Sequence, residues 1–488
     1  MSLISDIKQS ILAVGDKRLF VVENRDGFIV SHKEALESEY GLNCRIFSGT
    51  SLDLRLVRDY EMVRDKESNF IFVPTEDFEI LDDVAEDCER VTINVQRFLS
   101  RYHWNTIKNL SLPELEWLYS QKQFVTLDAI TTANKVCEYQ RSPDYRKNAI
   151  NELLKEWDRL TAKIDFRKAS DWMPALSRIM VSALALESWG KFGDKIQELN
   201  EKFQVFLSEQ YKAIQYSGVS PLRPKIVSHF APFIARQDDN GKYALIVIDG
   251  MNFWQAIILA NALEDSSRNL SIKYQASMAW LPSVTELSRQ AIFRGEMPTS
   301  SYIQNPHNEQ KLWEFFWKKK QVPSPGIYYQ YGGELTPNFN SIRVGYVNTD
   351  LDDMMHGAMS YLYLYEDTMR WVKESTIIED IIKLAENGFK IYLTSDHGNI
   401  ETMPYKAIAQ ADKAGAVSDR RYITISEHAE SGRFENSYEG HVQKLFDDDR
   451  TYYAIDREIF STQDGVVTHG GSHFLEVIIP FFTITKHS

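Results

Sequence analysis

The stretch that decides the fold is ALIVIDG, Ala244 to Gly250, in which an apolar run ends in a carboxylate. A second run, IYLTSDHG at 391–398, ends in Asp396 and His397. Short apolar runs of this kind are typical of buried strands, and helical patterns lie between them, which predicts an α/β fold with a mainly parallel sheet. Ligands gather at the carboxyl ends of the strands in such sheets. We therefore expect these acidic residues and His397 to meet at one edge of a sheet.

The carboxyl-terminal half as a whole is predicted to alternate strands with helices. Apolar runs with β-branched residues predict the strands, and apolar positions at helical spacing predict the helices. The expected strands are 243–248, 343–347 and 389–394, and the expected helices are 253–263, 352–365 and 376–387.

Two more stretches in this half carry metal-ligand residues. In DDMMH, residues 352–356, Asp352 and His356 are four positions apart and share one face if Asp352 starts a helix. In VVTHGG, residues 466–471, His469 follows an apolar run. Carboxylates and imidazoles gathered from distant parts of a chain suit a centre for two divalent cations.

Each stretch taken alone has a simpler interpretation. Asp249 before Gly250 is a common turn, Asp352 is a helix cap, and His469 is a stray histidine in a flexible turn. All four stretches occur in one half of the chain, which favours the metal centre over four separate coincidences.

A nucleophile is predicted in LPSVTELSR, residues 281–289. Pro282 and Ser283 end a loop and Glu286–Phe293 is predicted to be a short helix, so Thr285 lies at or near the N-cap. Free backbone N–H groups and the helix dipole favour an anion there. The alternative is an ordinary threonine cap. A threonine hydroxyl attacks at neutral pH only when a base or metal lowers its pKa.

These ordered motifs resemble the alkaline phosphatase superfamily and, within it, the PglZ domain. The ending His469-Gly470-Gly471, then Glu476 to Pro480, is the part most similar to PglZ, whereas Ser-Asp-His-Gly also resembles the cofactor-independent phosphoglycerate mutases. The resemblance covers about residues 240 to 488. It implies an alkaline-phosphatase-like α/β sandwich. No Cys-x-Pro-x-Arg stretch is present, which argues against a sulfatase.

The resemblance also implies the ligands of two divalent metal ions. One ion is expected on Asp249, Thr285, Asp396 and His397, and the other on Asp352, His356 and His469. Zinc is favoured by histidine and carboxylate ligands, and manganese is the main competitor because no thiolate is present. Two alternatives stay open: Asp350 or Asp353 in place of Asp352, and His473 in place of His469.

The implied function is a phosphoester hydrolase with Thr285 as its nucleophile. PglZ-like domains resemble diesterases, and no basic pocket for a doubly charged monoester is evident. The nearby cations are Arg289, Arg294 and Lys318 to Lys320. Arg289, one helical turn after Thr285, is expected either to reach a phosphate oxygen or to be an exposed structural arginine.

The resemblance places the protein in bacterial phage defence (BREX), with protein partners of such a system. A metal-containing scaffold or ligand-sensing subunit, or a phosphomutase, is the alternative.

Three domains are predicted. Residues 1–110 have the pattern of a small α/β unit, 111–223 are helical, and 224–488 form the PglZ-like catalytic domain, which we expect to retain activity alone. Residues 217–241, rich in Pro and Gly, are predicted to be a linker.

Composition limits the remaining classes. No apolar run of 18 or more residues occurs and no signal peptide begins the sequence, so we expect a cytoplasmic protein without membrane contact. The net charge of -14 makes strong nonspecific binding to nucleic acid unexpected, although a nucleotide substrate stays open. The three cysteines, Cys44, Cys88 and Cys137, are expected to be buried structural thiols.

Overall fold

The computed structural model divides the chain into two compact units, Met1–Asn151 and Glu152–Ser488. It describes residues 2–24, 26–39, 43–75, 78–121, 123–238, 241–299, 301–413, 416–425, 431–446, 450–462 and 466–486. The boundary between the units falls inside the segment 111–223, so the division into three domains stays a prediction.

The first unit is built on a four-stranded parallel sheet with the order β2-β3-β1-β4. Alternate residues of β1 face two separate apolar cores, with Leu19 and Val21 on one side and Phe20 and Val22 on the other, as expected for a parallel sheet covered on both faces. The strands are β1 Leu19–Glu23, β2 Cys44–Gly49, β3 Asn69–Pro74 and β4 Cys88–Thr92. The helices are α1 Leu3–Leu12, α2 Phe28–Ser31, α3 Lys33–Ser38, α4 Ser51–Leu56, α5 Met62–Arg64, α6 Asp82–Ala85, α7 Trp104–Ile107, α8 Leu112–Ser120 and α9 Ala129–Gln140.

Cys44 and Cys88 are buried in this unit as expected, but Cys137 is exposed, so the prediction of three buried thiols is wrong for Cys137. The residue lies on α9, which presents its other face to the core through Val136 and Tyr139.

Helix α10 (Pro143–Thr161) crosses the boundary between the units, and two long helices follow it in the second unit. They are α11 (Ala169–Ala185) and α12 (Gly193–Gln215), and both bury apolar side chains in the same core as the strands of that unit. The prediction of a linker over 217–241 is wrong for its central part. Residues 227–229 form a 3-10 turn, α13 (Phe230–Ile234) follows, and Ile226, Val227 and Phe230 are fully buried.

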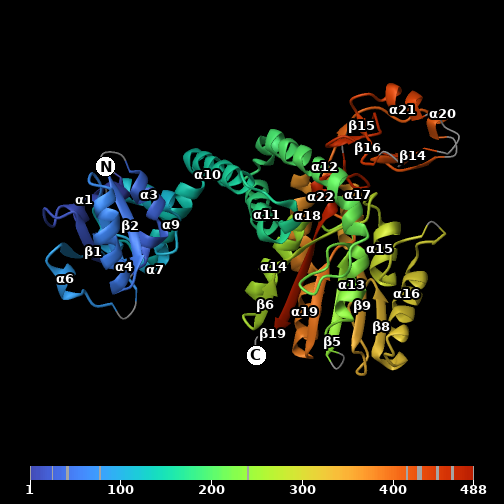
Figure 1. Ribbon diagram of the computed structural model, residues 1–488, viewed down its shortest axis with the longest axis horizontal. Coiled ribbons are helices and arrows are strands. Elements are labelled where there is room, and N and C mark those ends of the chain that lie inside the picture. The colour runs from blue at the N-terminus through green and yellow to red at the C-terminus, as the bar shows by residue number, and fades with distance from the viewer. Residues whose placement is uncertain are drawn as a thin grey trace. The chain divides into compact units, whose positions relative to one another are not determined.

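The second unit contains a seven-stranded sheet, in which β6-β19-β10-β5-β9-β8 lie in this order and β7 pairs with β19 (Figure 1). Strands β10, β5, β9 and β8 are parallel neighbours, whereas β19 runs antiparallel to β10. The mainly parallel α/β fold predicted from the sequence is therefore confirmed. The bounds are β5 Lys242–Ile248, β6 Leu270–Lys273, β7 Ala276–Met278, β8 Ile327–Tyr331, β9 Arg343–Asn348, β10 Phe389–Thr394 and β19 Ile478–Lys486.

Helices pack on both faces of this sheet. Helix α14 contacts α18 and α19 in one group of helices, and α15 contacts α13 and α16 in the other. Their bounds are α14 Phe253–Ser266, α15 Thr285–Arg294, α16 Pro306–Lys319, α17 Asp350–Gly357, α18 Tyr361–Glu374 and α19 Ile377–Glu386.

The single helix predicted over 352–365 is wrong, because the chain forms α17 and α18 with a break at Ala358. The backbone of Ala358 is extended, and its carbonyl accepts a hydrogen bond from the amide of Val467 at 3.0 Å. Pairing with a distant strand thus ends the first helix.

Between β10 and β19 the chain forms an insertion with its own small core. Its sheet has the order β13-β14-β16-β15, and two-stranded pairs β11-β18 and β12-β17 connect it to the rest of the unit. The strands are β11 Ile400–Glu401, β12 Met403–Pro404, β13 Val417–Ser418, β14 Tyr422–Thr424, β15 Val442–Gln443, β16 Thr451–Ala454, β17 Glu458–Ile459 and β18 Val467–Thr468; the helices are α20 Gln410–Lys413, α21 Ser431–Ser437 and, after the insertion, α22 Phe474–Val477. Within the described ranges, no helix combines the length and apolar character needed to cross a membrane.

Candidate metal centre and nucleophile

The first group of metal-ligand atoms lies where β5 and β10 end. These strands are parallel neighbours, with Val247 opposite Thr394, so Asp249 and the pair Asp396-His397 leave the sheet at the same edge. His397 Nε2 is 3.7 Å from Asp249 Oδ1 and 3.8 Å from Asp396 Oδ2, and the three side chains are at most 5% exposed. The sequence predicts that these residues meet at one edge of the sheet, and they lie together there in the fold.

The second group contains Asp352, His397 and His469, whose candidate ligand atoms all lie within 4.8 Å of one another. The rings of His397 and His469 stack with centroids 3.9 Å apart. His356 lies one turn after Asp352 on α17, with its Nε2 3.3 Å from Asp352 Oδ2 and its ring 5.7 Å from that of His469. Of the side chains assigned to the second ion, Asp352 and His469 belong to this group, whereas His356 lies beside Asp352 but outside it, and His397 belongs to both groups.

Both buried histidines are oriented by backbone carbonyls. His397 Nδ1 lies 2.9 Å from the carbonyl of Gly398, and His469 Nδ1 lies 3.0 Å from the carbonyl of Ser283. A carbonyl only accepts, so each Nδ1 must carry the proton and donate it. Each Nε2 is then left with its lone pair directed into the centre, as in metal-binding histidines.

Each of the three carboxylates has one oxygen that is held and one that is buried without a partner. Arg289 holds Asp249 Oδ2, His356 holds Asp352 Oδ2, and Asp396 Oδ1 accepts the amides of Gly250 and His397. The second oxygens (Asp249 Oδ1, Asp352 Oδ1 and Asp396 Oδ2) are buried and make no hydrogen bond. A buried unpaired carboxylate oxygen is costly, so these atoms fit the coordination of cations.

The pKa shifts of the acids and histidines in this cluster also fit the binding of cations. Burial raises the pKa of Asp396 to about 6, and burial together with the nearby Asp396 raises the pKa of Asp249. Burial is the largest cause that lowers the pKa of His469, to about 3. Burial opposes the ionised form of Asp352, but interactions with its neighbours, first of all the hydrogen bond with His356, outweigh burial and lower its pKa. Divalent cations would stabilise this set of ionised acids and neutral imidazoles.

Thr285 lies beside both groups. It is the first residue of α15, with Val284 as the N-cap, and its Oγ1 is 3.1 Å from His397 Nε2. Thr285 is partly exposed, as Asp352 is, whereas Asp249 and Asp396 are buried. The preceding Ser283 donates its hydroxyl to the carbonyl of Gly471 at 2.8 Å and accepts the amide of Gly470 at 3.1 Å. The loop before the hydroxyl is thereby fixed to the His-Gly-Gly loop.

The alternative ligands lie in other environments. Asp350 accepts hydrogen bonds from Asn348 and from the indole of Trp371, and Asp353 is exposed on α17. His473 pairs with Asp456, at 3.4 Å, and its Nδ1 accepts the amide of Leu475. Of the described candidates, Asp352 and His469 are therefore the pair that faces the other ligands.

Arg289 is buried, so the expectation of an exposed structural arginine is wrong, whereas its contact with a phosphate oxygen stays a prediction. Its side chain is 3% exposed and pairs with Asp249 at 2.6 Å and with Glu309 at 2.7 Å. Glu309 also accepts the hydroxyl of Tyr329 at 2.6 Å. The sequence reasoning missed Glu309, because α16 approaches α15 only in the fold.

A buried polar network behind the ligands was also missed. Asn252 donates to the carbonyls of Asn399 and Leu475, and Asn399 donates to Gly250 and Gln255. Gly398 allows this approach, because a Cβ there would lie 2.0 Å from the carbonyl oxygen of Leu475. The position of Asn399 directly after Ser-Asp-His-Gly is the signal that could have indicated its role.

Glu476 connects the His-Gly-Gly loop to the insertion. One of its oxygens accepts the amide of Gly471 at 2.8 Å, and its carboxylate pairs with Arg421, both side chains being fully buried. Arg421 also donates to the carbonyls of Asp456 and Glu458. The glutamate of the PglZ-like ending therefore joins two segments that border the centre.

Residues 228–484, more than half of the chain, match the model of the family described as the BREX system PglZ alkaline phosphatase-like domain. The chain belongs to the PglZ family. The family resemblance and the fold predicted from the sequence are thus confirmed. None of the curated proteins compared with this PglZ protein matches it.

Three solved structures are similar over half of this PglZ protein. Murine ectonucleotide pyrophosphatase/phosphodiesterase 5 is 12% identical, with a TM-score of 0.37, covering 50% of this chain and 87% of that chain. Its inactive variant in complex with AMP is 13% identical, with a TM-score of 0.35 and coverages of 50% and 88%. The human protein is 13% identical, with a TM-score of 0.33 and coverages of 50% and 87%. Similarity at these TM-scores carries no inference about function.

Proposed function

We propose that the second unit is a metal-dependent phosphoester hydrolase with Thr285 as its nucleophile. The observation that carries this proposal is the set of three carboxylates, each with one buried and unpartnered oxygen, that converge with histidines beside the Thr285 hydroxyl. Membership of an alkaline phosphatase-like family agrees with this chemistry.

The donor set fits two divalent ions. Asp249, Asp396 and His397, with Thr285, would hold one ion, and Asp352, His356 and His469 would hold the other. Zinc suits these oxygen and nitrogen donors, and manganese is the alternative. The bound ions would lower the pKa of the threonine hydroxyl and offset charge on the phosphoryl oxygens.

Hydrolysis then proceeds in two displacements at phosphorus. The Thr285 oxygen gives its proton to solvent water and forms a bond to phosphorus while the bond to one ester oxygen breaks, and the departing alkoxide takes up a proton from solvent water. The phosphoryl group stays on Thr285 until a water oxygen attacks phosphorus and the threonine oxygen departs and regains a proton. The start of α15 directs its free backbone N–H groups toward the anion during both steps.

A phosphodiester is the favoured substrate class. Arg289, the cation nearest to Thr285 in the sequence, is already neutralised by Asp249 and Glu309. It therefore supplies no charge for the second negative charge of a phosphomonoester. A nucleotide diester fits this class.

Turnover of matched aryl esters tests the proposal. The zinc- or manganese-loaded protein should cleave a bis-aryl phosphate faster than the mono-aryl phosphate with the same leaving group. A clear preference for the monoester would refute the diesterase assignment. Hydrolysis of neither ester by metal-loaded protein would refute the hydrolase and favour a scaffold or ligand-sensing subunit.

We also propose that this activity serves bacterial phage defence alongside protein partners, as the BREX name of the family suggests. The test is a plaque assay in a host that carries the complete system. Replacing Thr285 by alanine in that system should abolish protection. Full protection with this variant would show that the hydroxyl is not required for defence.

A further inference from the structure

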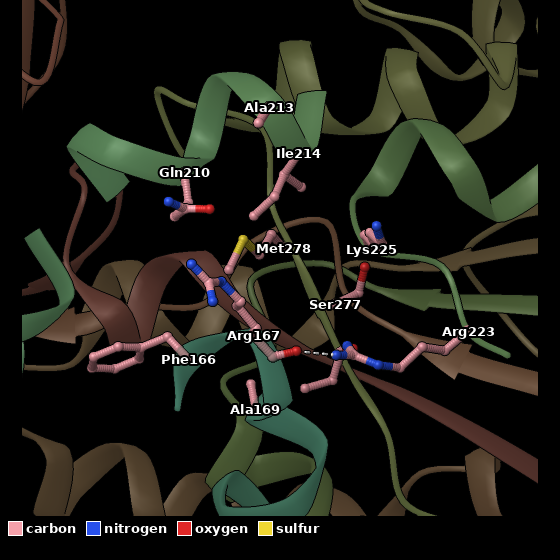
Figure 2. A pocket seen from close by; sticks show the side chains of 11 residues that line it. Phe166, Arg167, Ala169, Gln210, Ala213, Ile214, Arg223, Lys225, Ser277 and Met278 are labelled. Carbon is pink, nitrogen blue, oxygen red and sulfur yellow. Dashed lines mark hydrogen bonds between the residues drawn. The ribbon is translucent and has the colours of Figure 1, made fainter. Parts of the chain in front are cut away.

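A cavity of about 230 Å³ lies within the second unit, lined by residues that the proposed reaction does not use (Figure 2). Its walls come from the 3-10 turn Phe166–Lys168, the end of α12, the segment from Arg223 to Lys225, and β7. Gln210, Ile214 and Met278 contribute to the lining. No metal ligand proposed above borders this cavity.

The charge of the cavity is positive although the protein carries a net charge of -14. Arg167, Arg223 and Lys225 line it, and none of its lining residues is acidic. Figure 2 shows that these cations come from two segments, the turn that begins at Phe166 and the segment around Arg223. Asp171 is the carboxylate that acts on Arg223 from outside the lining.

Arg223 is fixed in place with donors to spare. Its two terminal nitrogens donate to the carbonyls of Ala276 and Arg167, at 2.7 and 2.6 Å. A guanidinium has five N–H donors, so these two bonds leave others for a ligand. The two carbonyls hold the planar group in one orientation, which favours recognition of an oxyanion.

The buried hydroxyl of Ser277 also indicates that the cavity holds a ligand. Its side chain lines the cavity, the residue is 2% exposed, and its hydroxyl makes no hydrogen bond within the described structure. A buried hydroxyl without a partner costs free energy that a ligand oxygen would recover. The hydroxyl and the three cations thus present donors to the same cavity.

We propose that this cavity binds a small organic phosphate. A phosphate dianion matches the three cations of the lining, and its oxygens accept from arginine, lysine and serine together. Ala169, Ile214 and Met278 provide the apolar surface for a small organic group. The site is separate from the metal centre and does not depend on turnover.

The site adjoins the segment that leads to Thr285. Strand β7 ends at Met278, and the hydroxyl of Tyr211, next to Gln210 on α12, donates to the carbonyl of Ala279 and accepts the amide of Leu281, at 2.9 and 2.8 Å. A ligand that bridges α12 and β7 would hold these elements together. Occupation of the cavity is therefore expected to stabilise the chain that runs to the nucleophile.

Calorimetric titration of chelator-treated full-length protein with phenylphosphonate tests the proposal. Chelation removes metal that could otherwise bind the phosphonate, and the probe is not an ester, so the outcome is independent of the proposed hydrolysis. The double variant Arg167→Gln/Lys225→Gln should bind at least about tenfold more weakly, equivalent to about 1.4 kcal/mol, since two positively charged donors are lost. Ser277→Ala should weaken binding by a smaller factor.

The matched control is Lys311→Gln/Lys373→Gln, which removes the same charge from exposed residues of α16 and α18, two helices that contribute nothing to the lining. This control should bind within about twofold of the unchanged protein, since distant exposed charges are screened by salt. Equal weakening in both double variants would mean nonspecific attraction and overturn the site. Absence of binding to the unchanged protein, or equal affinity for benzoate, would overturn the proposed ligand class.

Hydrogen exchange provides the second readout. Phenylphosphonate should slow exchange of the Leu281 amide, which donates to Tyr211, in the unchanged protein but not in Arg167→Gln/Lys225→Gln. Binding without slower exchange would overturn the link to the nucleophile segment.

Discussion

Thr285 combines partial exposure with a hydroxyl 3.1 Å from His397 Nε2, so its side chain is suited to chemistry more than to packing. Thr285→Ala should lower hydrolysis of a bis-aryl phosphate by at least about a thousandfold, equivalent to about 4 kcal/mol in activation free energy. Thr285→Ser should retain a measurable fraction, because a hydroxyl remains at the start of α15.

Steady-state rates with unchanged metal content and circular dichroism establish that the loss concerns chemistry. Full activity of Thr285→Ala would show that water attacks directly or that another residue is the nucleophile.

Arg289 is predicted to stabilise the fold. Arg289→Ala would leave the carboxylates of Asp249 and Glu309 buried without their shared cation, which typically costs about 3–5 kcal/mol in the free energy of unfolding. The control is Arg294→Ala on the same helix, whose side chain is 32% exposed and pairs with Glu296, and which should cost less than about 1 kcal/mol.

Urea unfolding of metal-free protein measures both values. Adding Glu309→Gln to Arg289→Ala should recover part of the loss, because one of the two unpaired charges is removed. Equal, small losses for Arg289→Ala and Arg294→Ala would contradict a structural role of the buried triad.

The residues that could be predicted from the sequence are those whose position is set locally. Asp249, Asp396 and His397 end apolar strands, and parallel strands bring their carboxyl ends to one edge. Arg289 could not be predicted, because its environment depends on Glu309 from the next helix. Arg421 and Glu476 pair over a separation of 55 residues, for which the sequence has no local signal.

Helices and strands also differ in whether the local sequence or a distant contact determines them. Strands β5, β9 and β10 agree closely with the predicted 243–248, 343–347 and 389–394, because each is a short segment rich in β-branched and aromatic residues. The break between α17 and α18 depends on pairing of Ala358 with Val467, and the burial of Val227 and Phe230 depends on the core around them. Tertiary contacts determine both the helix break and the burial of these side chains, so local sequence patterns could not predict either feature.

Helices α11 and α12 argue against the expectation that residues 224–488 suffice for activity. Trp172, Met173 and Leu176 of α11 are buried in the same core as β5, and Asn200 of α12 accepts the amide of Phe474. Loss of each large buried side chain removes about 1.5–3 kcal/mol, so loss of several exceeds a typical total stability of about 5–15 kcal/mol.

Two fragments test this argument. Residues 152–488 should be soluble and should retain metal binding and diester hydrolysis, whereas residues 224–488 should be insoluble or unfolded. Activity of the shorter fragment equal to that of the longer one would show that α11 and α12 are dispensable.

At the scale of the whole molecule, seven side chains of the second unit carry the proposed metal binding and catalysis. They come from segments spread over 221 residues, and the fold gathers them near the carboxyl ends of the strands. They are Asp249, Thr285, Asp352, His356, Asp396, His397 and His469. We propose that their free oxygens and nitrogens bind two cations.

Elemental analysis of full-length protein, purified without chelator, tests this claim most directly. We predict about two divalent ions per chain, and about one in each of the variants Asp396→Ala and His469→Ala, which change ligands of different ions. A metal content near zero, with no recovery after incubation with zinc or manganese, would contradict the account.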